Sequence, residues 1–417
     1  MKIAVLGSGT LGVATAWWLH QDGHEVLVID RQPGPALECS RANGGQISVS
    51  YAEPWANPKA PWRLARWLFK DDAPLWFKPS LDPKQWMWGL RFLWECQPKR
   101  FEPNVKALLR LAEYSRTVLQ EMRQSVNVEY HCLEKGILSF YRDERSFDEA
   151  QEMADVMRNF GIDRRILSAD ELVALVPALA GIKHQIAGGD FHPEDESGDA
   201  YEWTTQLAAQ LASKGVEFQY STQVTRLCAE QGQVQHLEIV DAEGDYQHVP
   251  VDAVVVALGA HSAALLSPLG ISCPVYPAKG YSASFDIKDA SAIPDTSLTD
   301  SARKMAYTRL GNTLRMAGTA ELSGYSRALN GKRCLAMVKQ AQELFPNALD
   351  FDNVQFWSGL RPATPSNVPL IGRTEVRNLY LNTGHGTLGW TLGAGSGKAL
   401  ADLIAGRQPE AEFPFLR

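Results

Sequence analysis

The glycine pattern near the N-terminus is the feature that most constrains the fold of this chain. Residues 7–12 read GSGTLG directly after the apolar run IAVL, and a helical segment then leads to a second apolar run, EVLVID, that ends at Asp30. Two of these glycines let the backbone turn and approach a pyrophosphate, the third allows close packing of helix and strand, and the helix N-terminus offers free N–H groups. The pattern predicts a βαβ unit that binds a dinucleotide, with Asp30 accepting ribose hydroxyls. The motif alone does not decide between NAD and FAD.

The other elements expected of a nucleotide-binding domain are spread over the whole chain. Apolar strands are predicted at 216–220, 251–262 and 378–384, helices at 105–122, 146–160, 200–214 and 389–404, and a β-hairpin at Gly311-Asn312. Segments 1–50, 184–265 and 350–417 are therefore assigned to a Rossmann-like domain, and segments 51–183 and 266–349 to a second, mostly antiparallel substrate domain. Such a discontinuous α/β plus α+β layout is not that of a simple NAD dehydrogenase.

Composition excludes several classes of function. The net charge of −7 and the pI near 5.8 provide no basic field for nucleic acid. The six cysteines are scattered without a CxxC pair, so we expect reduced thiols in a cytosolic chain and no metal site. The acidic residues of PEDESGD, Asp195, Glu196 and Asp199, are interpreted as a solvated loop rather than as metal ligands. The start of the sequence lacks the apolar run of a signal peptide, and no segment approaches the about 18 apolar residues of a spanning helix.

Five motifs, in order along nearly the whole chain, carry a family resemblance. GSGTLG with Asp30, RANGGQIS at 41–48, PVYPAKGYS at 274–282, WSGLRPATP at 357–365 and LNTGHGTLGWT at 381–391 together resemble the FAD-dependent D-amino acid dehydrogenases of the small-subunit type, within the D-amino acid oxidase superfamily. The resemblance implies a D-amino acid oxidase-like fold, with FAD as cofactor. It further implies oxidative deamination of D-amino acids such as D-alanine to 2-oxo acids and ammonia. Hydride would pass from Cα to flavin N5, and electrons then to a quinone-type acceptor. An oxidase for glycine, sarcosine or a proline-like substrate, reducing oxygen to peroxide, remains the alternative.

The same resemblance suggests roles for individual residues. Arg361 is expected to bind the substrate carboxylate, because a planar guanidinium makes two parallel charge-assisted hydrogen bonds. Tyr51, Tyr276 and Tyr281 are candidates to offer a hydroxyl to the substrate. His385 is expected beside the flavin ring rather than as a proton acceptor. The residues predicted to bind FAD are Gly7, Ser8, Gly9, Thr10, Leu11, Gly12, Asp30, Arg31, Asn43, Gly44, Gly45, Gln46, Ile47, Gly259, Gly384, His385, Gly386, Thr387, Leu388 and Gly389.

A tryptophan-rich segment at 54–94 has two interpretations. It contains seven of the twelve tryptophans, at positions 55, 62, 67, 76, 86, 88 and 94, together with Arg63, Arg66, Lys70, Lys84 and Arg91. The rings could pack as a cap on the substrate domain. Alternatively, Trp mixed with Lys and Arg is typical of a helix at a membrane surface, as an enzyme that reduces a membrane quinone requires. We expect part of this segment, chiefly 62–78, to contact the inner membrane from its cytoplasmic side.

Overall fold

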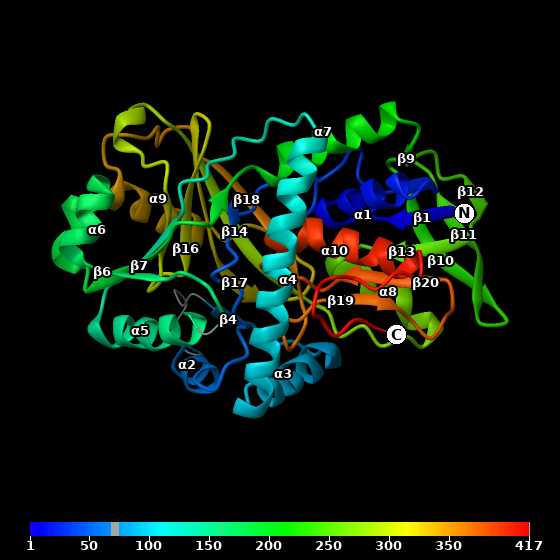
Figure 1. The fold of residues 1–417 in the computed structure, drawn as a ribbon, viewed down its shortest axis with the longest axis horizontal. Helices are drawn as coiled ribbons and strands as arrows, with labels where there is room; N and C mark the ends of the chain where they lie inside the picture. Colours follow the sequence, from blue (N-terminus) through cyan, green and yellow to red (C-terminus); the bar gives the residue numbers. More distant parts are fainter. Residues whose placement is uncertain (68–74, 159, 417) are drawn as a thin grey trace.

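Two β-sheets form the two halves of the protein, and the long helix α4 runs in front of the place where the halves meet (Figure 1). The computed structural model describes residues 1–67, 75–158 and 160–416. The six-stranded sheet has the order β19-β20-β13-β1-β2-β9, parallel except at β19. Its strands are β1 (Lys2–Leu6), β2 (Glu25–Ile29), β9 (Glu217–Gln219), β13 (Ala253–Val256), β19 (Leu370–Arg373) and β20 (Leu379–Thr383).

Both faces of this sheet are covered, which explains why its strands read as continuous apolar runs. Ile3 and Val5 of β1 point to a helical layer, whereas Ala4 and Leu6 point to the opposite face. A three-stranded antiparallel sheet, β10-β11-β12, covers that second face and contributes Leu237 to its core. The bounds of this sheet are β10 (Gln223–Glu230), β11 (Gln233–Val240) and β12 (Tyr246–Pro250).

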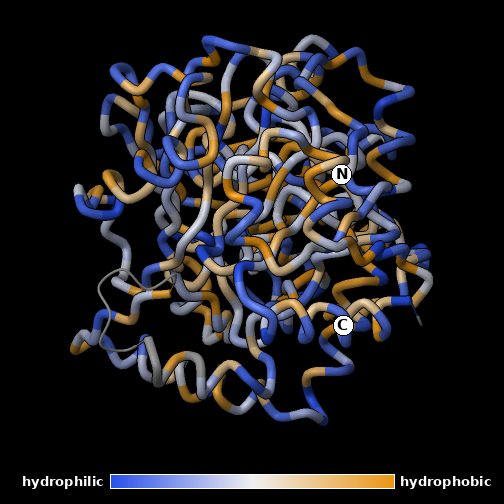
Figure 2. Tube along the Cα trace, turned by 90° about the vertical axis from the view of Figure 1, so that its left-hand side faces the viewer, coloured by the Kyte–Doolittle hydropathy of each residue, from blue (hydrophilic) through white to orange (hydrophobic). Residues whose placement is uncertain are grey.

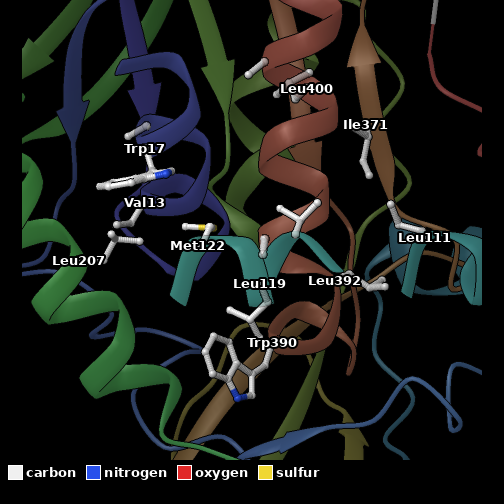
Figure 3. Packing of buried hydrophobic residues seen from close by; sticks show 14 of the residues in the cluster. Val13, Trp17, Leu111, Leu119, Met122, Leu207, Ile371, Trp390, Leu392 and Leu400 are labelled. Atoms are coloured by element: carbon white, nitrogen blue, oxygen red, sulfur yellow. The ribbon is translucent and has the colours of Figure 1, made fainter. Parts of the chain in front are cut away.

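The helical layer contains α1 (Thr10–Gln21), α4 (Pro98–Ser125), α7 (Ala200–Ser213) and α10 (Gly389–Ile404). Figure 3 shows Trp17, Leu119 and Leu392 from three of these helices meeting in one apolar cluster. Glycines in α10 permit the close approach: a Cβ at Gly395 would collide with Ser115 of α4. The Ser115 hydroxyl also accepts a hydrogen bond from the Gly395 N–H at 3.0 Å. Along the trace, hydrophobic residues gather toward the interior and many outer turns are hydrophilic (Figure 2).

The second sheet has nine strands and is mostly antiparallel, in the order β18-β14-β17-β16-β15-β5-β7-β6, with β4 pairing beside β17. Its strands are β4 (Leu75–Phe77), β5 (Ile137–Tyr141), β6 (Arg165–Ser168), β7 (Gly188–His192), β14 (Tyr276–Asp286), β15 (Ser297–Asp300), β16 (Met305–Leu310), β17 (Thr313–Leu322) and β18 (Gln355–Ala363). The predicted hairpin forms between β16 and β17, with Gly311 at φ 60°. A two-stranded ladder, β3 (Gln46–Ile47) with β8 (Glu196–Ser197), lies outside this sheet.

The remaining helices surround the second sheet or cap one end of it, except the helix Ser262–Leu266, which packs in the six-stranded half beside β10 (Figure 1). They are α2 (Ala60–Trp67), α3 (Pro83–Glu95), α5 (Glu144–Arg158), α6 (Ala169–Leu175), α8 (Ser262–Leu266) and α9 (Gly331–Leu344), with short 3₁₀ turns η1 (Pro177–Gln185), η2 (Gly259–His261), η3 (Ser267–Leu269) and η4 (Ala290–Ala292). Among the helices in the described part of the chain, none combines the length and the apolar character needed to cross a bilayer.

The fold class is the predicted one, but the packing of three elements differs from the predicted domain segments. Strand β7 lies within 184–265, and β18 lies within 350–417, yet both pair inside the nine-stranded sheet. Helix α4, within 51–183, packs on the nucleotide-domain helices α1 and α10 instead. Pairing between strands that are distant in the sequence decides which sheet an element joins. The local hydrophobic periodicity of a segment does not indicate this pairing.

Candidate active site

A cavity of about 810 Å³ lies between the two halves of the protein. It extends from the GSGTLG turn, past the carboxyl ends of β1 and β2, to the cap formed by α2 and α3. The carboxyl edge of a parallel sheet is where ligands bind in open α/β folds. Most predicted cofactor residues line this cavity, whereas Ser8, Gly12, Ile47 and Gly384 do not.

The glycine turn has the close approach that a dinucleotide site requires. Gly7 has φ 103°, and a Cβ there would lie 2.7 Å from the Ala257 carbonyl oxygen. Asp30 is buried at the end of β2, where its carboxylate accepts hydrogen bonds from the Ser8 N–H and hydroxyl at 2.6 and 2.7 Å. Ser8 therefore supports Asp30 from behind the cavity wall. Arg31, predicted as a cofactor residue, also lines the cavity and binds Glu38.

Two helix N-termini open on the same cavity. Gly9 precedes α1 and Leu388 precedes α10, and neither provides a side-chain cap. Thr10 and Leu11 of α1 and Gly389 of α10 line the cavity. Free N–H groups at a helix start carry partial positive charge and favour anions. The α1 terminus therefore fits a pyrophosphate, and the α10 terminus fits a ring that accumulates negative charge on reduction.

The NGG turn and the C-terminal turn complete the wall. Asn43 fixes its turn by accepting the Gly45 N–H at 3.0 Å, and Gly45 has φ 70°. The Gln46 amide nitrogen donates to Ser297 at 2.9 Å, so this side chain anchors the turn to the substrate sheet. At the other turn, the Gly386 N–H donates to the Pro362 carbonyl at 2.9 Å, which ties that turn to the residue after Arg361.

His385 lies buried within this C-terminal turn. Its Nε2 is 3.0 Å from the Ser396 hydroxyl of α10. Burial lowers the pKa of His385 to about 3, so the imidazole is neutral near pH 7 and is a poor proton acceptor. The predicted place of His385 beside the flavin ring stays a prediction.

Arg361 occupies the substrate side of the cavity with its charge unpaired. Nη1 donates to the Thr319 carbonyl oxygen at 2.6 Å, where Thr319 adopts φ 53° at an irregularity in the β14–β17 pairing. Within the described residues, no carboxylate forms an ion pair with this guanidinium. Burial lowers the pKa of Arg361, so the site would gain from binding an anion. Gly280 leaves the space that the guanidinium fills, because a Cβ there would collide with it.

Tyr51 lines the cavity with its hydroxyl 3.2 Å from that of Ser301. The turn that carries it is held by Asp195, whose carboxylate accepts the Val49 N–H at 3.0 Å and also binds Ser50. Below the Tyr51 ring, buried Arg164 lies 5.4 Å from the ring centroid.

Arg164 belongs to a buried charge network that reaches the cavity. Its guanidinium pairs with Glu53 at 3.1 Å and with Asp190 at 3.7 Å, and Asp190 also accepts from Tyr141. Burial opposes ionisation of Asp190, but Arg164 and His192 outweigh it and lower its pKa. Glu53 lines the cavity and was not predicted as a site residue. One sequence feature could have indicated Glu53 as a site residue: it is an acidic residue two positions after Tyr51.

The acidic run predicted as a solvated loop is buried instead. Asp195, Glu196 and Asp199 are at most 6% exposed. Each has a partner far away in the sequence: Ser50 binds Asp195, Arg123 binds Glu196, and Arg315 pairs with Asp199 at 3.1 Å. Tertiary partners therefore stabilise charges that a local pattern assigns to solvent.

The other two tyrosines are less well placed. The Tyr281 hydroxyl donates to Glu321 at 2.7 Å, beside the Lys279–Glu321 ion pair at 3.0 Å. Tyr276 does not line the cavity and packs in the cap cluster near Trp88, with a ring-centroid distance of 6.3 Å. Tyr281 lines the cavity with its hydroxyl bound to Glu321, and a substrate contact by either tyrosine stays a prediction.

The tryptophan-rich segment divides into a buried and an exposed set. Trp88 packs inside the cap and donates from Nε1 to the Ala363 carbonyl at 2.8 Å, as the cap interpretation predicts. Trp62 of α2 is 78% exposed, and α3 presents an outer apolar face. The outer face of α3 consists of Trp86, Met87, Leu90, Leu93 and Trp94. The predicted contributions of Lys70 and of the side chains of Arg63, Arg66 and Trp67 lie outside the described part of the chain.

The family is established by comparison with known proteins. The model of the FAD dependent oxidoreductase family, DAO, matches residues 2–403, so the chain belongs to this family and FAD is its cofactor. Among curated proteins, the chain is similar to the D-amino acid dehydrogenase of Dechloromonas aromatica (strain RCB), with 49% identity over 417 residues and 100% of both chains covered. The D-amino acid dehydrogenase of Paramagnetospirillum magneticum is 46% identical, covering 98% of this chain and 96% of that protein.

Solved structures share the fold at low sequence identity. Glycine oxidase from Bacillus cereus ATCC 14579 superimposes with a TM-score of 0.75 at 23% identity, covering 98% of this chain and 95% of that one. L-proline dehydrogenase from P. horikoshii gives a TM-score of 0.73 at 17% identity, with 99% and 95% covered. These similarities place the chain in the D-amino acid oxidase fold. The glycine turn, Asp30 and the two helix N-termini at the cavity fit the FAD that the family binds.

Proposed function

We propose that this protein is an FAD-dependent dehydrogenase that deaminates D-amino acids such as D-alanine to 2-oxo acids and ammonia. The observation that carries this proposal is Arg361, an unpaired cation in the wall of the cavity that also contains the dinucleotide-binding turn. The names of its full-length relatives support the choice of substrate class.

The chain contributes binding and orientation to the reaction. Arg361 holds the substrate carboxylate through charge-assisted hydrogen bonds, worth about 1.5–3 kcal/mol each. Tyr51 offers its hydroxyl from the neighbouring wall, and the two contacts together restrict how Cα can point. FAD, when bound, supplies the acceptor for the hydride that leaves Cα. The pKa of His385, lowered to about 3 by burial, makes this imidazole too weak a base to take the proton of the substrate ammonium, so that proton passes to solvent.

The residues of the cap favour a lipid-soluble molecule as the electron acceptor. Its inner side lines the cavity with the apolar residues Trp55, Leu64, Leu75 and Phe92. Its outer side presents the apolar face of α3, with exposed Lys84 and Arg91 beside it. Aromatic and basic residues mixed in this way favour the interfacial zone of a bilayer. The proposal therefore extends to a quinone acceptor and to peripheral contact with the inner membrane from its cytoplasmic side.

Anaerobic stopped-flow spectroscopy tests the proposed reaction. D-alanine is expected to bleach the flavin absorbance of the holoenzyme much faster than L-alanine does. Arg361→Gln should lower kcat/KM about 100-fold or more while FAD remains bound. The exposed Arg145→Gln variant serves as the matched control. A flavin that stays oxidised across a panel of D-amino acids would refute the proposal, and stoichiometric peroxide without quinone reduction would indicate an oxidase instead.

A further inference from the structure

The three-stranded sheet carries a cluster of side chains that the proposed reaction does not use. Cys228 of β10 lies directly opposite His236 of β11, and Glu238 follows two residues along β11 on the same face. The Cys228 Sγ, a ring nitrogen of His236 and a carboxylate oxygen of Glu238 all lie within 4.8 Å of one another. The thiol donates to Glu238 Oε1 at 3.3 Å. Thiol, imidazole and carboxylate thus converge on one point from two paired strands.

The surroundings hold this cluster in place. His248 of β12 stacks on His236 with ring centroids 4.7 Å apart and fixes the plane of that imidazole. On the opposite face, Leu227 and Leu237 are buried against the nucleotide sheet, so the backbone under the cluster is packed. The ligand side chains themselves are only half buried, which leaves a path for an ion to enter.

We propose that Cys228, His236 and Glu238 form a binding site for Zn²⁺ or a similar borderline-soft divalent cation. Thiolate, imidazole and carboxylate are the ligand types that zinc takes in proteins, and three protein ligands plus water is a common arrangement. No metal site was expected from the sequence, because the six cysteines are scattered without a CxxC pair. The cross-strand register brings Cys228 and His236 together.

A second cluster of possible metal ligands differs from the proposed site in the positive charge already bound to it. Cys132, Glu134 and Glu196 also converge, but Arg123 pairs with both carboxylates there. A guanidinium therefore already supplies the positive charge of that cluster. At the proposed site, Arg226 lies 3.9 Å from Glu238 and is 66% exposed, so an incoming cation can displace it.

Metal binding would act on the stability of the nucleotide-binding half. The ion would tie β10 to β11, and Val224 and Thr225 at the start of β10 line the cofactor cavity. A ligand that binds only the folded state stabilises it by mass action. A thiol must lose its proton to act as a metal ligand, so binding near pH 7 should release a proton.

Isothermal titration of the chelator-treated holoenzyme with Zn²⁺ tests the site. We expect one saturable site per chain and proton release in buffers of different ionisation enthalpy. Cys228→Ser and His236→Gln should each weaken binding at least tenfold. The control Cys273→Ser, which alters a half-buried thiol outside this cluster, should leave binding unchanged.

A second titration with Cd²⁺ reports the thiolate directly. The wild-type holoenzyme should gain ultraviolet thiolate-to-metal absorption, and the Cys228→Ser variant should not. Absence of a one-to-one site, or equal affinity in the wild type and both ligand variants, would overturn the proposal. Because these readouts do not depend on turnover, they remain informative even if the proposed dehydrogenase activity is wrong.

Discussion

Gly280 of β14 leaves the space that the guanidinium of Arg361 occupies, since a Cβ at Gly280 would overlap Cζ and both terminal nitrogens. The two residues lie on paired strands, where Arg361 is opposite Ala278. From there Nη1 reaches the Thr319 carbonyl. The position of the carboxylate-binding group thus depends on a missing side chain in the neighbouring strand.

Gly280→Ala should therefore displace Arg361 without removing it. We expect the KM for D-alanine to rise about tenfold or more, because small displacements of a binding group are costly when geometry provides the catalysis. FAD content and the flavin spectrum should not change. Steady-state kinetics check this against Gly331→Ala, where an added Cβ meets nothing within 4 Å. Equal KM values in the two variants would show that Arg361 does not need this space.

Tyr51→Phe tests the second proposed substrate contact. A hydrogen bond between neutral groups contributes about 0.5–1.5 kcal/mol, so kcat/KM for D-alanine should fall about 2- to 13-fold. The ring should stay in place because Arg164 lies against it and Asp195 holds its turn. Flavin reduction rates measure the effect, with Tyr246→Phe, 79% exposed, as control. Unchanged kinetics in Tyr51→Phe would show that the Tyr51 hydroxyl does not contact the substrate and contacts only Ser301.

The sequence predicted best where function depends on local backbone. The GSGTLG turn needs glycine for close approach at Gly7, and that requirement is visible within six residues. The bulge at Thr319 is different, because a threonine at φ 53° has no sequence signature. The Thr319 carbonyl orients Arg361. Arg361 itself was predicted from its motif, whereas the contact that orients it was not. The cysteine and histidine of the sheet cluster likewise became neighbours only through strand register.

Tyr281, which lines the cavity, shows what strand geometry adds to a sequence prediction. Successive residues of a strand point to opposite faces, so Tyr281 and Gly280 of β14 cannot both face Arg361. The structure places the Tyr281 hydroxyl on Glu321. Asp195 could not have been predicted in the same way, since its partner Ser50 is 145 residues away and only the fold brings them together.

The outer face of α3 provides a test of membrane contact. Leu90 and Leu93 are 69% and 48% exposed, and replacing both with serine should not disturb the cap packing of Trp88. Burying a large apolar side chain contributes about 1.5–3 kcal/mol, so the double variant should lose most of its binding to anionic liposomes. Flotation assays measure this. The control replaces two exposed residues on the second sheet with serine, Leu175 in α6 and Leu335 in α9. Equal flotation of both double variants would argue against membrane contact through α3, while leaving the flavin chemistry untouched.

His385 should make the folded protein sensitive to acid. Its pKa falls from 6.5 in the unfolded chain to about 3 in the folded protein, because burial disfavours the charged imidazole. Below pH 6.5 the unfolded chain binds a proton that the folded protein does not. Stability is therefore lost as the pH falls from 6.5 toward 3, at up to about 1.4 kcal/mol per pH unit.

His385→Asn removes this proton linkage while keeping a polar side chain near Ser396. Between pH 6.5 and pH 5 the free energy of unfolding, measured by urea titration, should fall by up to about 2 kcal/mol more in the wild type than in the variant. Carboxylates that titrate in the same range contribute to both proteins and cancel in the difference. The exposed His184→Gln variant should retain the wild-type slope. Parallel pH dependence in the wild type and His385→Asn would mean that the buried imidazole accepts a proton in the folded state. His385 would then be a candidate to take the substrate proton, which the proposed mechanism assigns to solvent.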